Sequence, residues 1–506
     1  MSAARVLVVG AGINGLVAAN TLRRGGADVL HLEKKDKPGG ACTVEWLEFE
    51  DGKKYPIPTG ASVFGMMQDF VFRETGLADR IQTYRSPKPK MVFFGEEATP
   101  LYLYEDSLAY AREARDKWGE TGDLVGYARD LNRVREFLLG GIRDASTPRW
   151  EEAVKVLGRE LAQRWIRGSA EALFAHYFTA DRTKIFESQP ITEAGPVGLD
   201  EPGSAFNVAV MATGSVMDGF WGFVNGGLWR LPLALAEINR DLGIDLQLPA
   251  EITAIDARTR TVRYRAGGKE TAETFDAIFL ATDPVTAGKL CGDAPLRKSV
   301  EEKRYLGSSG KLVLVFREPV RWKDTPSDPE TDAAVRYFYV PTTWKDFVAS
   351  NDAVREGAEY SPCHFQIYVE GAAMRKMGWR EPFDYVSVFF KDMGLGGHGA
   401  DLPAVQADVQ RRVLARVANP GALIGSRMFT PRDLQETFFF PEGNIDHMEL
   451  CDGQNFLARS FSTAPAEDFY RFGANQGVYY CGAGAYPSGS VAGTPGWMAV
   501  RQWQRR

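Results

Sequence analysis

The chain begins with two short apolar runs separated by a glycine-rich turn and a segment of helical periodicity. Residues 5–9, RVLVV, form a continuous apolar run, which is typical of a strand buried on both faces of a parallel sheet. Apolar side chains then recur at helical spacing from Ile13 to Leu22, and residues 28–33 form the second run. This order predicts a β-α-β unit whose glycines lie in the first turn.

Related patterns return later in the chain. Residues 222–284 predict a glycine turn, a helix and short strands that end in the apolar run 277–281, and residues 477–506 predict a strand, a glycine-rich loop and a helix. The two long intervals between them carry mixed helical patterns, as in 151–178, and an alternating strand, KLVLVF, at 311–316. A later helix is expected to place Val405, Val409, Val413 and Val417 on one face.

This interleaving predicts a discontinuous α/β architecture. With 506 residues the chain exceeds the size at which one hydrophobic core keeps growing. We therefore expect a Rossmann-like dinucleotide-binding domain assembled from residues 1–60, 221–295 and 470–506. An α+β substrate domain is expected to take residues 61–220 and 296–469.

Composition narrows the function classes. A net charge of −6 without a basic stripe gives no reason to expect a nucleic-acid partner. Five scattered cysteines without a CxxC predict neither a disulfide framework nor zinc and fit a reducing cytoplasm, and no acidic cluster, HxxxH or GxSxG predicts a metal site or a serine hydrolase. No signal peptide or membrane-spanning helix is expected, whereas peripheral membrane contact stays open.

The first turn contains GxGxxG, formed by Gly10, Gly12 and Gly15. In a dinucleotide fold these allow a tight turn, the approach of a pyrophosphate and close helix–strand packing, while the amides at the helix start, Ile13 and Asn14, face the phosphates. Glu33 follows Gly15 by 18 residues and is placed to bind ribose hydroxyls and repel a 2′-phosphate. Taken alone, GxGxxG allows NAD or FAD.

A second glycine pair, Gly39 and Gly40, follows the predicted ribose-binding acid. It permits another close approach of backbone to a pyrophosphate, which suits the extended FAD better than NAD. Lys34, Lys35 and Lys37 lie between Glu33 and this pair. We interpret these lysines as a solvated turn; the alternative, a phosphate contact, keeps Lys34 among the cofactor-binding candidates.

These motifs resemble those of the flavoprotein amine oxidase and phytoene desaturase superfamily. Residues 6–45 resemble its dinucleotide-binding segment, and YYCGAGAYPSGSVAGTPGWMA at 479–499 resembles its closing FAD motif. TPRDLQ and PEGNIDHMEL, at 430–435 and 441–450, resemble a branch near carotenoid isomerases, retinol saturases and the pyridine nucleotide-disulphide oxidoreductase domain protein. The resemblance spans nearly the whole chain and implies non-covalent FAD in a domain of the glutathione reductase/amine oxidase type.

The resemblance also assigns roles to residues. It places Gly39, Gly40 and Ala41 on the flavin-side phosphate strip, although many desaturases have Arg where Ala41 stands, which leaves the contacts to backbone. It implies that the backbone at Ile252 meets the adenine. The terminal loop and helix start near the ribityl chain and flavin would comprise Gly482, Ala483, Val491 and Ala492. Cys481 is interpreted as a core cysteine and not as a covalent flavin link.

Catalytic side chains are less clearly indicated. GKLVLVF resembles the amine oxidase strand whose lysine holds a water near flavin N5, which makes Lys311 a catalytic candidate; the competing interpretation is a solvent-facing lysine at a strand start. His176, His364 and His447 are candidates for proton transfer, but none has a spaced partner, so core or surface hydrogen bonding is the simpler interpretation.

The favoured function is an FAD-dependent oxidoreductase acting on a small apolar substrate, with isoprenoids and polyenes as candidates. Desaturation, saturation and redox-assisted isomerisation all stay open, as does the electron acceptor: quinone, dioxygen or NAD(P). The alternatives are an amine or amino-acid oxidase using dioxygen, and a non-catalytic prenyl-binding protein of the GDP-dissociation-inhibitor type.

Overall fold

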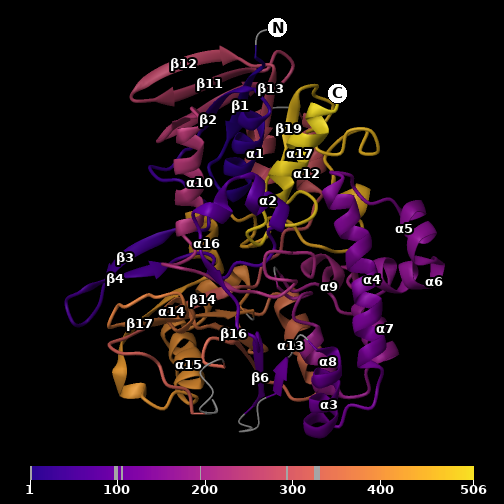
Figure 1. Cartoon of the computed structure of the whole chain (residues 1–506), viewed down its shortest axis with the longest axis vertical. Helices are drawn as coiled ribbons and strands as arrows, with labels where there is room; N and C mark the ends of the chain where they lie inside the picture. Colours follow the sequence, from indigo (N-terminus) through magenta and orange to yellow (C-terminus); the bar gives the residue numbers. More distant parts are fainter. Residues whose placement is uncertain are drawn as a thin grey trace.

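Two β-sheets organise the chain in the computed structural model (Figure 1). The structure describes residues 3–95, 101–103, 106–193, 195–291, 294–323, 331–391 and 393–506. The first sheet lies at the top of Figure 1, near both termini, and the second at the bottom. The site described below lies between them.

The first sheet is parallel throughout and has five strands. Their order is β19 (Val478–Tyr480), β13 (Ala277–Leu280), β1 (Arg5–Val9), β2 (Asp28–Leu32) and β9 (Asp245–Gln247). The strands come from all three segments expected to form the dinucleotide-binding domain. Residues of β1 and β13 are almost all buried, as their continuous apolar runs predicted.

Three helices lie side by side against this sheet. The central helix α1 (Ile13–Arg24) packs against α17 (Thr494–Gln504) on one side and α10 (Arg230–Asp241) on the other. A three-stranded antiparallel sheet, β10 (Ala250–Asp256), β11 (Thr261–Ala266) and β12 (Lys269–Thr274), covers another part of the unit. Together, these elements bring two helix N-termini, those of α1 and α17, toward the second sheet.

The second sheet has seven strands. Their order is β18 (Leu423–Phe429), β14 (Gly310–Phe316), β17 (Asp384–Phe390), β16 (His364–Tyr368), β15 (Val335–Tyr339), β6 (Lys90–Phe94) and β7 (Leu101–Leu103). All neighbours are antiparallel except β15 and β6. The alternation in KLVLVF does not separate an exposed face from a buried one: β14 is buried along its whole length, because α15 and β4 contact it.

Most of the other helices lie against the second sheet or pack on one another beside it. They are α3 (Ser107–Trp118), α4 (Leu124–Arg143), α5 (Trp150–Leu157), α6 (Arg159–Ala162), α7 (Ala170–Tyr177), α8 (Asp181–Glu187), α9 (Phe206–Met211), α13 (Trp344–Arg355), α14 (Glu370–Lys376), α15 (Leu402–Leu414) and α16 (Pro431–Phe438). The helical pattern at 151–178 is divided, since Gly158 adopts φ +84° and a π-helical turn follows at Gln163–Arg167. On α15 the predicted valine face is buried, although Val417 lies beyond the helix end.

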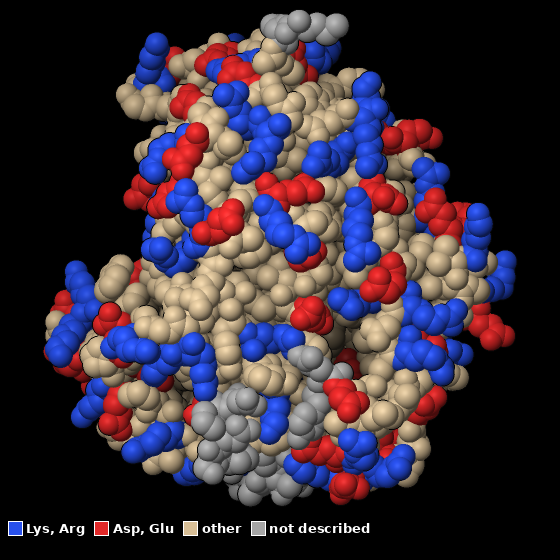
Figure 2. Space-filling model, in the orientation of Figure 1, with Lys and Arg blue, Asp and Glu red and all other residues tan. Residues whose placement is uncertain are grey.

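The remaining elements are short. They are β3 (Val44–Glu48), β4 (Lys54–Pro58), β5 (Thr83–Tyr84), β8 (Phe223–Val224), α2 (Asp69–Glu74), α11 (Pro284–Cys291), α12 (Ala294–Glu301) and 3-10 turns at Leu77–Asp79, Leu395–Gly399, Pro420–Ala422 and Phe456–Arg459. Over the described ranges, no helix is long and apolar enough to cross a bilayer. On the face shown in Figure 2, basic and acidic side chains are interspersed.

Candidate functional site

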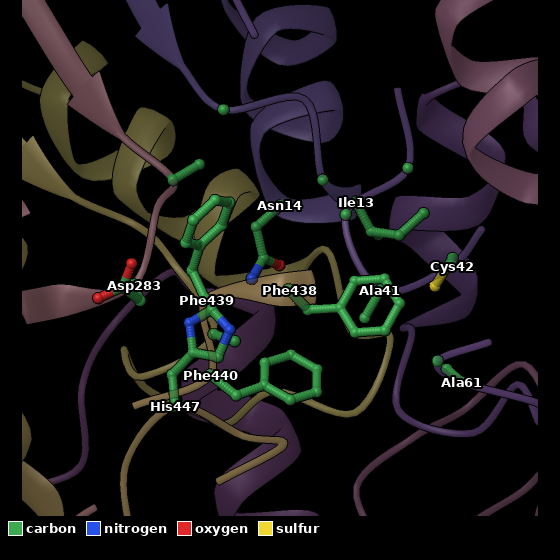
Figure 3. A pocket seen from close by; sticks show the side chains of 18 of the residues that line it. Ile13, Asn14, Ala41, Cys42, Ala61, Asp283, Phe438, Phe439, Phe440 and His447 are labelled. Carbon is green, nitrogen blue, oxygen red and sulfur yellow. The ribbon is translucent and has the colours of Figure 1, made fainter. Parts of the chain in front are cut away.

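A cavity of about 470 Å³ lies between the elements of the first sheet and those of the second (Figure 3). Its volume is within the range of cofactor and small-ligand sites. Most of the residues predicted to bind cofactor line it: Gly10, Gly12, Ile13, Asn14, Glu33, Lys34, Gly39, Gly40, Ala41, Ile252, Ala483, Val491 and Ala492. The other two predicted residues, Gly15 and Gly482, lie behind the wall.

The glycine turn forms one side of the cavity. Gly10 adopts φ +92°, which disfavours any side chain there, and its amide donates to the Leu32 carbonyl at 2.8 Å. A Cβ on Gly15 would overlap the Gly10 carbonyl oxygen, so this glycine allows α1 to approach β1. Gly12 bridges to Gly39 of the second pair, so both glycine strips border the same space.

The N-terminus of α1 faces this space with its amides. Gly12 is the N-cap and has no side chain to accept from the first turn, and the first intrahelical bond runs from the Leu16 amide to the Gly12 carbonyl at 2.9 Å. Asn14 presents a buried Oδ1 that has no hydrogen-bond partner among the described residues. Free amides and the helix dipole suit an anion such as a pyrophosphate.

Glu33 lies at the end of β2, where the sequence predicted a ribose-binding acid. Its carboxylate accepts from the Ala11 amide at 2.6 Å and from the Lys35 amide at 2.8 Å, which fixes its orientation. The Glu33 carbonyl accepts from the Ala250 amide at 2.6 Å, which holds β10 and Ile252 beside it. Two carboxylate oxygens retain acceptor capacity for ribose hydroxyls.

The interpretation of residues 34–37 as a solvated turn is wrong for Lys35. Its Nζ donates to the Thr437 carbonyl and lies 4.9 Å from the centre of the Phe438 ring, so burial lowers its pKa. Lys34 stays exposed, 3.3 Å from Glu251, and contacts Phe439 at 5.6 Å from the ring centre. The two lysines therefore contact the end of α16, whose aromatic rings project into the cavity in Figure 3.

The C-terminal loop closes another side. Ser490 and Val491 adopt φ +54° and +62°, which is unusual for any residue and most of all for a β-branched one. The Ser490 hydroxyl donates to Asp446 Oδ1 at 2.8 Å, and burial raises the pKa of Asp446. The α17 helix then begins after Gly493, without a side-chain cap. Val491 and Ala492 thus precede a second uncapped helix N-terminus.

Two residues at the base of this loop are structural. A Cβ on Gly482 would overlap the Thr282 carbonyl oxygen, which shows why the chain has glycine there. Cys481 is fully buried at the end of β19, and burial raises the pKa of its thiol. Neither residue lines the cavity.

Lys311 is buried, so the solvent-facing interpretation is wrong. Its Nζ donates to the Gly60 carbonyl at 2.6 Å and to Ser62 Oγ at 2.8 Å, and both of these residues line the cavity. Burial lowers the pKa of Lys311 and raises that of Glu370, the nearby acid. Lys311 itself is not part of the lining, so the structure supports a role in positioning the Gly60–Ser62 wall.

The three histidine candidates separate by position. His176 is exposed on α7, and His364 is buried in the second sheet, where burial lowers its pKa to about 3. His447 lines the cavity, and its Nδ1 has no hydrogen-bond partner in the part of the chain that the structure describes. Burial lowers the pKa of His447 to about 4 despite nearby Asp283. His447 is therefore the candidate that could act on a ligand, as a neutral imidazole at pH 7.

The sequence did not indicate the far end of the cavity. This end is lined by Trp221, Tyr368, Phe389 and the carboxylate of Glu193, which come from separate segments. Nothing local marks them, because an aromatic residue in a buried strand has the same pattern whether or not it borders a cavity. Phe438, Phe439 and Phe440 also line the cavity, and nothing in their local sequence shows that they do.

Comparison with known proteins agrees with this geometry. Residues 8–72 match the NAD(P)-binding Rossmann-like domain family. A zeta-carotene-forming phytoene desaturase of Myxococcus xanthus is 28% identical over 335 residues, which span 61% of this chain and 60% of that protein. An uncharacterized protein of Mycobacterium tuberculosis is 24% identical over 98% of this chain and 96% of its own length.

A solved structure of putrescine oxidase, with putrescine bound, aligns with 99% of this chain and 98% of its own at 14% identity and a TM-score of 0.59. The chain is thus similar in sequence to a phytoene desaturase and shares its fold with putrescine oxidase. The α/β fold predicted from the sequence is thereby confirmed, and the predicted resemblance to phytoene desaturases agrees with the sequence comparison. The two glycine strips, the oriented Glu33 and the uncapped helix starts fit a bound dinucleotide.

Proposed function

We propose that the protein is an FAD-dependent oxidoreductase that exchanges a hydride between non-covalently bound flavin and an apolar substrate. The observation that carries this proposal is the continuity of one cavity, which runs from the glycine strips at α1 to a wall of Trp221, Tyr368 and Phe389. A dinucleotide held at the first end leaves the aromatic end for a substrate.

Two features favour FAD over NAD(P) as the resident cofactor. The strip Gly39–Gly40 lies beside Gly12 and extends the cradle, and the loop Ser490–Ala492 brings the N-terminus of α17 to the same cavity. When bound, FAD supplies a ring that accepts and returns a hydride. The partial positive charge of the α17 N-terminus favours negative charge at that end of the cavity.

The other groups of the chain position and shield the reacting partners. Lys311 holds Gly60 and Ser62 in place from behind the wall. The aromatic side chains exclude water, and His447 offers a neutral imidazole nitrogen that can hold or move a proton. The reaction is a desaturation, a saturation or a redox-assisted isomerisation of an isoprenoid or polyene, with electrons passing to or from quinone, dioxygen or NAD(P). The proposal includes peripheral contact of the protein with a membrane and no nucleic-acid partner.

An amine or amino-acid oxidase that uses dioxygen is the second candidate. The aromatic wall and a buried lysine on β14 favour it. A non-catalytic prenyl-binding protein is disfavoured, because it would have no need for both glycine strips together with an oriented acid at the end of β2.

Anaerobic photoreduction tests the proposal. Purified protein is expected to show an oxidised-flavin spectrum that bleaches under light and returns with one of dioxygen, a quinone or NAD(P)+ added in turn. Hydrogen peroxide release on addition of amines would favour the oxidase instead. A preparation that contains no flavin and cannot be reconstituted with FAD would contradict the proposal.

A further inference from the structure

The far end of the cavity contains an acidic side chain where a hydrocarbon substrate would need none. Glu193 lines this end beside Trp221 and Tyr368, and it is only 5% exposed. Burying a carboxylate is costly unless its oxygens are hydrogen-bonded. The hydrogen-bond partners of its two oxygens therefore indicate what else the carboxylate can bind.

One carboxylate oxygen of Glu193 is well supplied with donors. Its Oε2 accepts from Gln189 Nε2 at 2.6 Å and from Gln366 Nε2 at 2.8 Å. The Gln366 amide is itself fixed, because its Oε1 accepts from the Tyr368 hydroxyl at 2.5 Å. Gln189 and Gln366 thus hold the Glu193 carboxylate in one orientation, and neither residue lines the cavity.

The other oxygen is poorly supplied. Glu193 Oε1 lies 3.4 Å from Lys391 Nζ, a long contact for a charged pair. Lys391 donates more closely to the Glu193 carbonyl at 2.6 Å and to Ser309 Oγ at 3.1 Å. Oε1 therefore keeps acceptor capacity for a further donor, and Glu193 lines the cavity.

The charges nearby decide which kind of donor fits. Lys391 offsets the charge of Glu193, and the aromatic rings already have cations beside them. Lys311 and Lys391 lie 5.2 and 4.9 Å from the centre of the Phe389 ring, and Lys90 lies 5.8 Å from that of Trp221. These lysines lie behind the cavity wall, where Glu370 faces Lys311 and Glu187 faces Lys90. A further ammonium group would therefore add an unbalanced charge, whereas a neutral hydroxyl would not.

We propose that the substrate is an apolar chain carrying a hydroxyl group, and that Glu193 accepts a hydrogen bond from this hydroxyl at the aromatic end of the cavity. This inference rests on the proposed function, since the cofactor must occupy the other end. Glu193 is then a specificity-determining residue: a site built around a buried acceptor discriminates strongly against a ligand that lacks the donor.

Three probes of one chain length test this inference on the flavin-loaded protein: farnesol, its methyl ether and farnesylamine. Binding is measured by the change in the visible flavin spectrum and, independently, by calorimetry. Farnesol is expected to bind at least about tenfold more tightly than the methyl ether, the effect of one hydrogen bond to a charged group, and more tightly than the amine.

Variants test the role of the carboxylate. Glu193→Gln is expected to reduce the preference for farnesol over its ether to within about twofold. Glu237→Gln, the same change on the exposed side of α10, is expected to keep the wild-type preference. The wild-type ranking decides the matter even if Glu193→Gln does not fold.

The outcomes separate the two proposals. Flavin-loaded protein that binds ether or amine as well as farnesol, or that binds none of the three, overturns the hydroxyl inference and leaves the oxidoreductase in place. Protein that lacks flavin and cannot be loaded overturns the proposed function instead. An unchanged preference in Glu193→Gln removes Glu193 from the recognition.

Discussion

Replacing Gly12 by alanine is expected to weaken dinucleotide binding while the fold is kept. Gly12 has φ −71°, which any residue can adopt, and an added Cβ would lie 3.8 Å from the nearest atom, the Gly40 Cα, at an ordinary contact distance. The same methyl group would stand between the two glycine strips, where a pyrophosphate must approach the backbone. The substitution is therefore expected to weaken binding of the dinucleotide more than it destabilises the folded protein.

The magnitude follows from the contacts at risk. A displaced pyrophosphate loses one or more hydrogen bonds to the amides of α1, each worth about 1.5–3 kcal/mol when the acceptor is charged, so the Kd for FAD should rise roughly 10- to 150-fold. The cost to the free protein is about 1 kcal/mol at most, since alanine is a poorer N-cap than glycine.

Gly15→Ala gives the opposite pattern. Its Cβ would overlap the Gly10 carbonyl oxygen and lie 3.1 Å from the Ala281 Cβ, so α1 must move away from β1. Such overpacking costs about 1–3 kcal/mol of unfolding free energy, even without flavin. Gly421→Ala is the neutral control, because no atom lies within 4 Å of an added Cβ.

Two assays separate these effects. Quenching of flavin fluorescence on titration of apoprotein with FAD gives the Kd, and urea denaturation of the apoproteins gives the free energy of unfolding. If Gly12→Ala binds FAD as tightly as the Gly421→Ala control, the space between the two glycine strips is not where the pyrophosphate lies.

Three further predictions concern residues around the cavity. Burial lowers the pKa of His31 to about 4, and its Nε2 lies 2.9 Å from the Gly10 carbonyl oxygen. Unfolding therefore binds a proton between about pH 6.5 and 4, and the contribution of His31 to stability is lost as the pH falls through this window. His31→Gln should flatten the pH dependence of urea denaturation in that window, whereas a change at exposed His176 should not. Val491→Gly should raise the free energy of unfolding by about 1 kcal/mol, because glycine relieves the strain at φ +62°, and a lower value would show that the Val491 side chain stabilises the loop more than its backbone strains it. Lys35→Met removes the contacts that hold the end of α16 over the cavity and should speed FAD release about 2- to 5-fold in stopped-flow measurements, a change that an exposed lysine such as Lys37 should not produce.

The cofactor end of the cavity could be predicted from the sequence because its determinants are local. An apolar run, a glycine turn and a helix lie within residues 5–24, and each glycine has a conformational or packing reason that the motif encodes. The approach of Gly39 to Gly12 follows once the second strand returns beside the first. The spacing of these residues in the sequence therefore predicts their arrangement in the fold.

The substrate end could not be predicted in this way. Tyr368 and Phe389 lie on β16 and β17 of the second sheet, and Glu193 and Trp221 join them from distant segments outside it. Lys311 was open to a solvent-facing interpretation because a strand pattern cannot reveal that elements cover both faces of β14. Lys35 appeared to be solvated because its partner, the end of α16, follows some 400 residues later.

The visible spectrum of the purified protein, followed through anaerobic photoreduction, tests the central claim most directly. We expect an oxidised-flavin spectrum that bleaches under light, and a flavin that separates from the polypeptide on denaturation, because Cys481 is buried and does not line the cavity. A colourless protein that takes up no FAD on reconstitution would show that the cavity is not a flavin site.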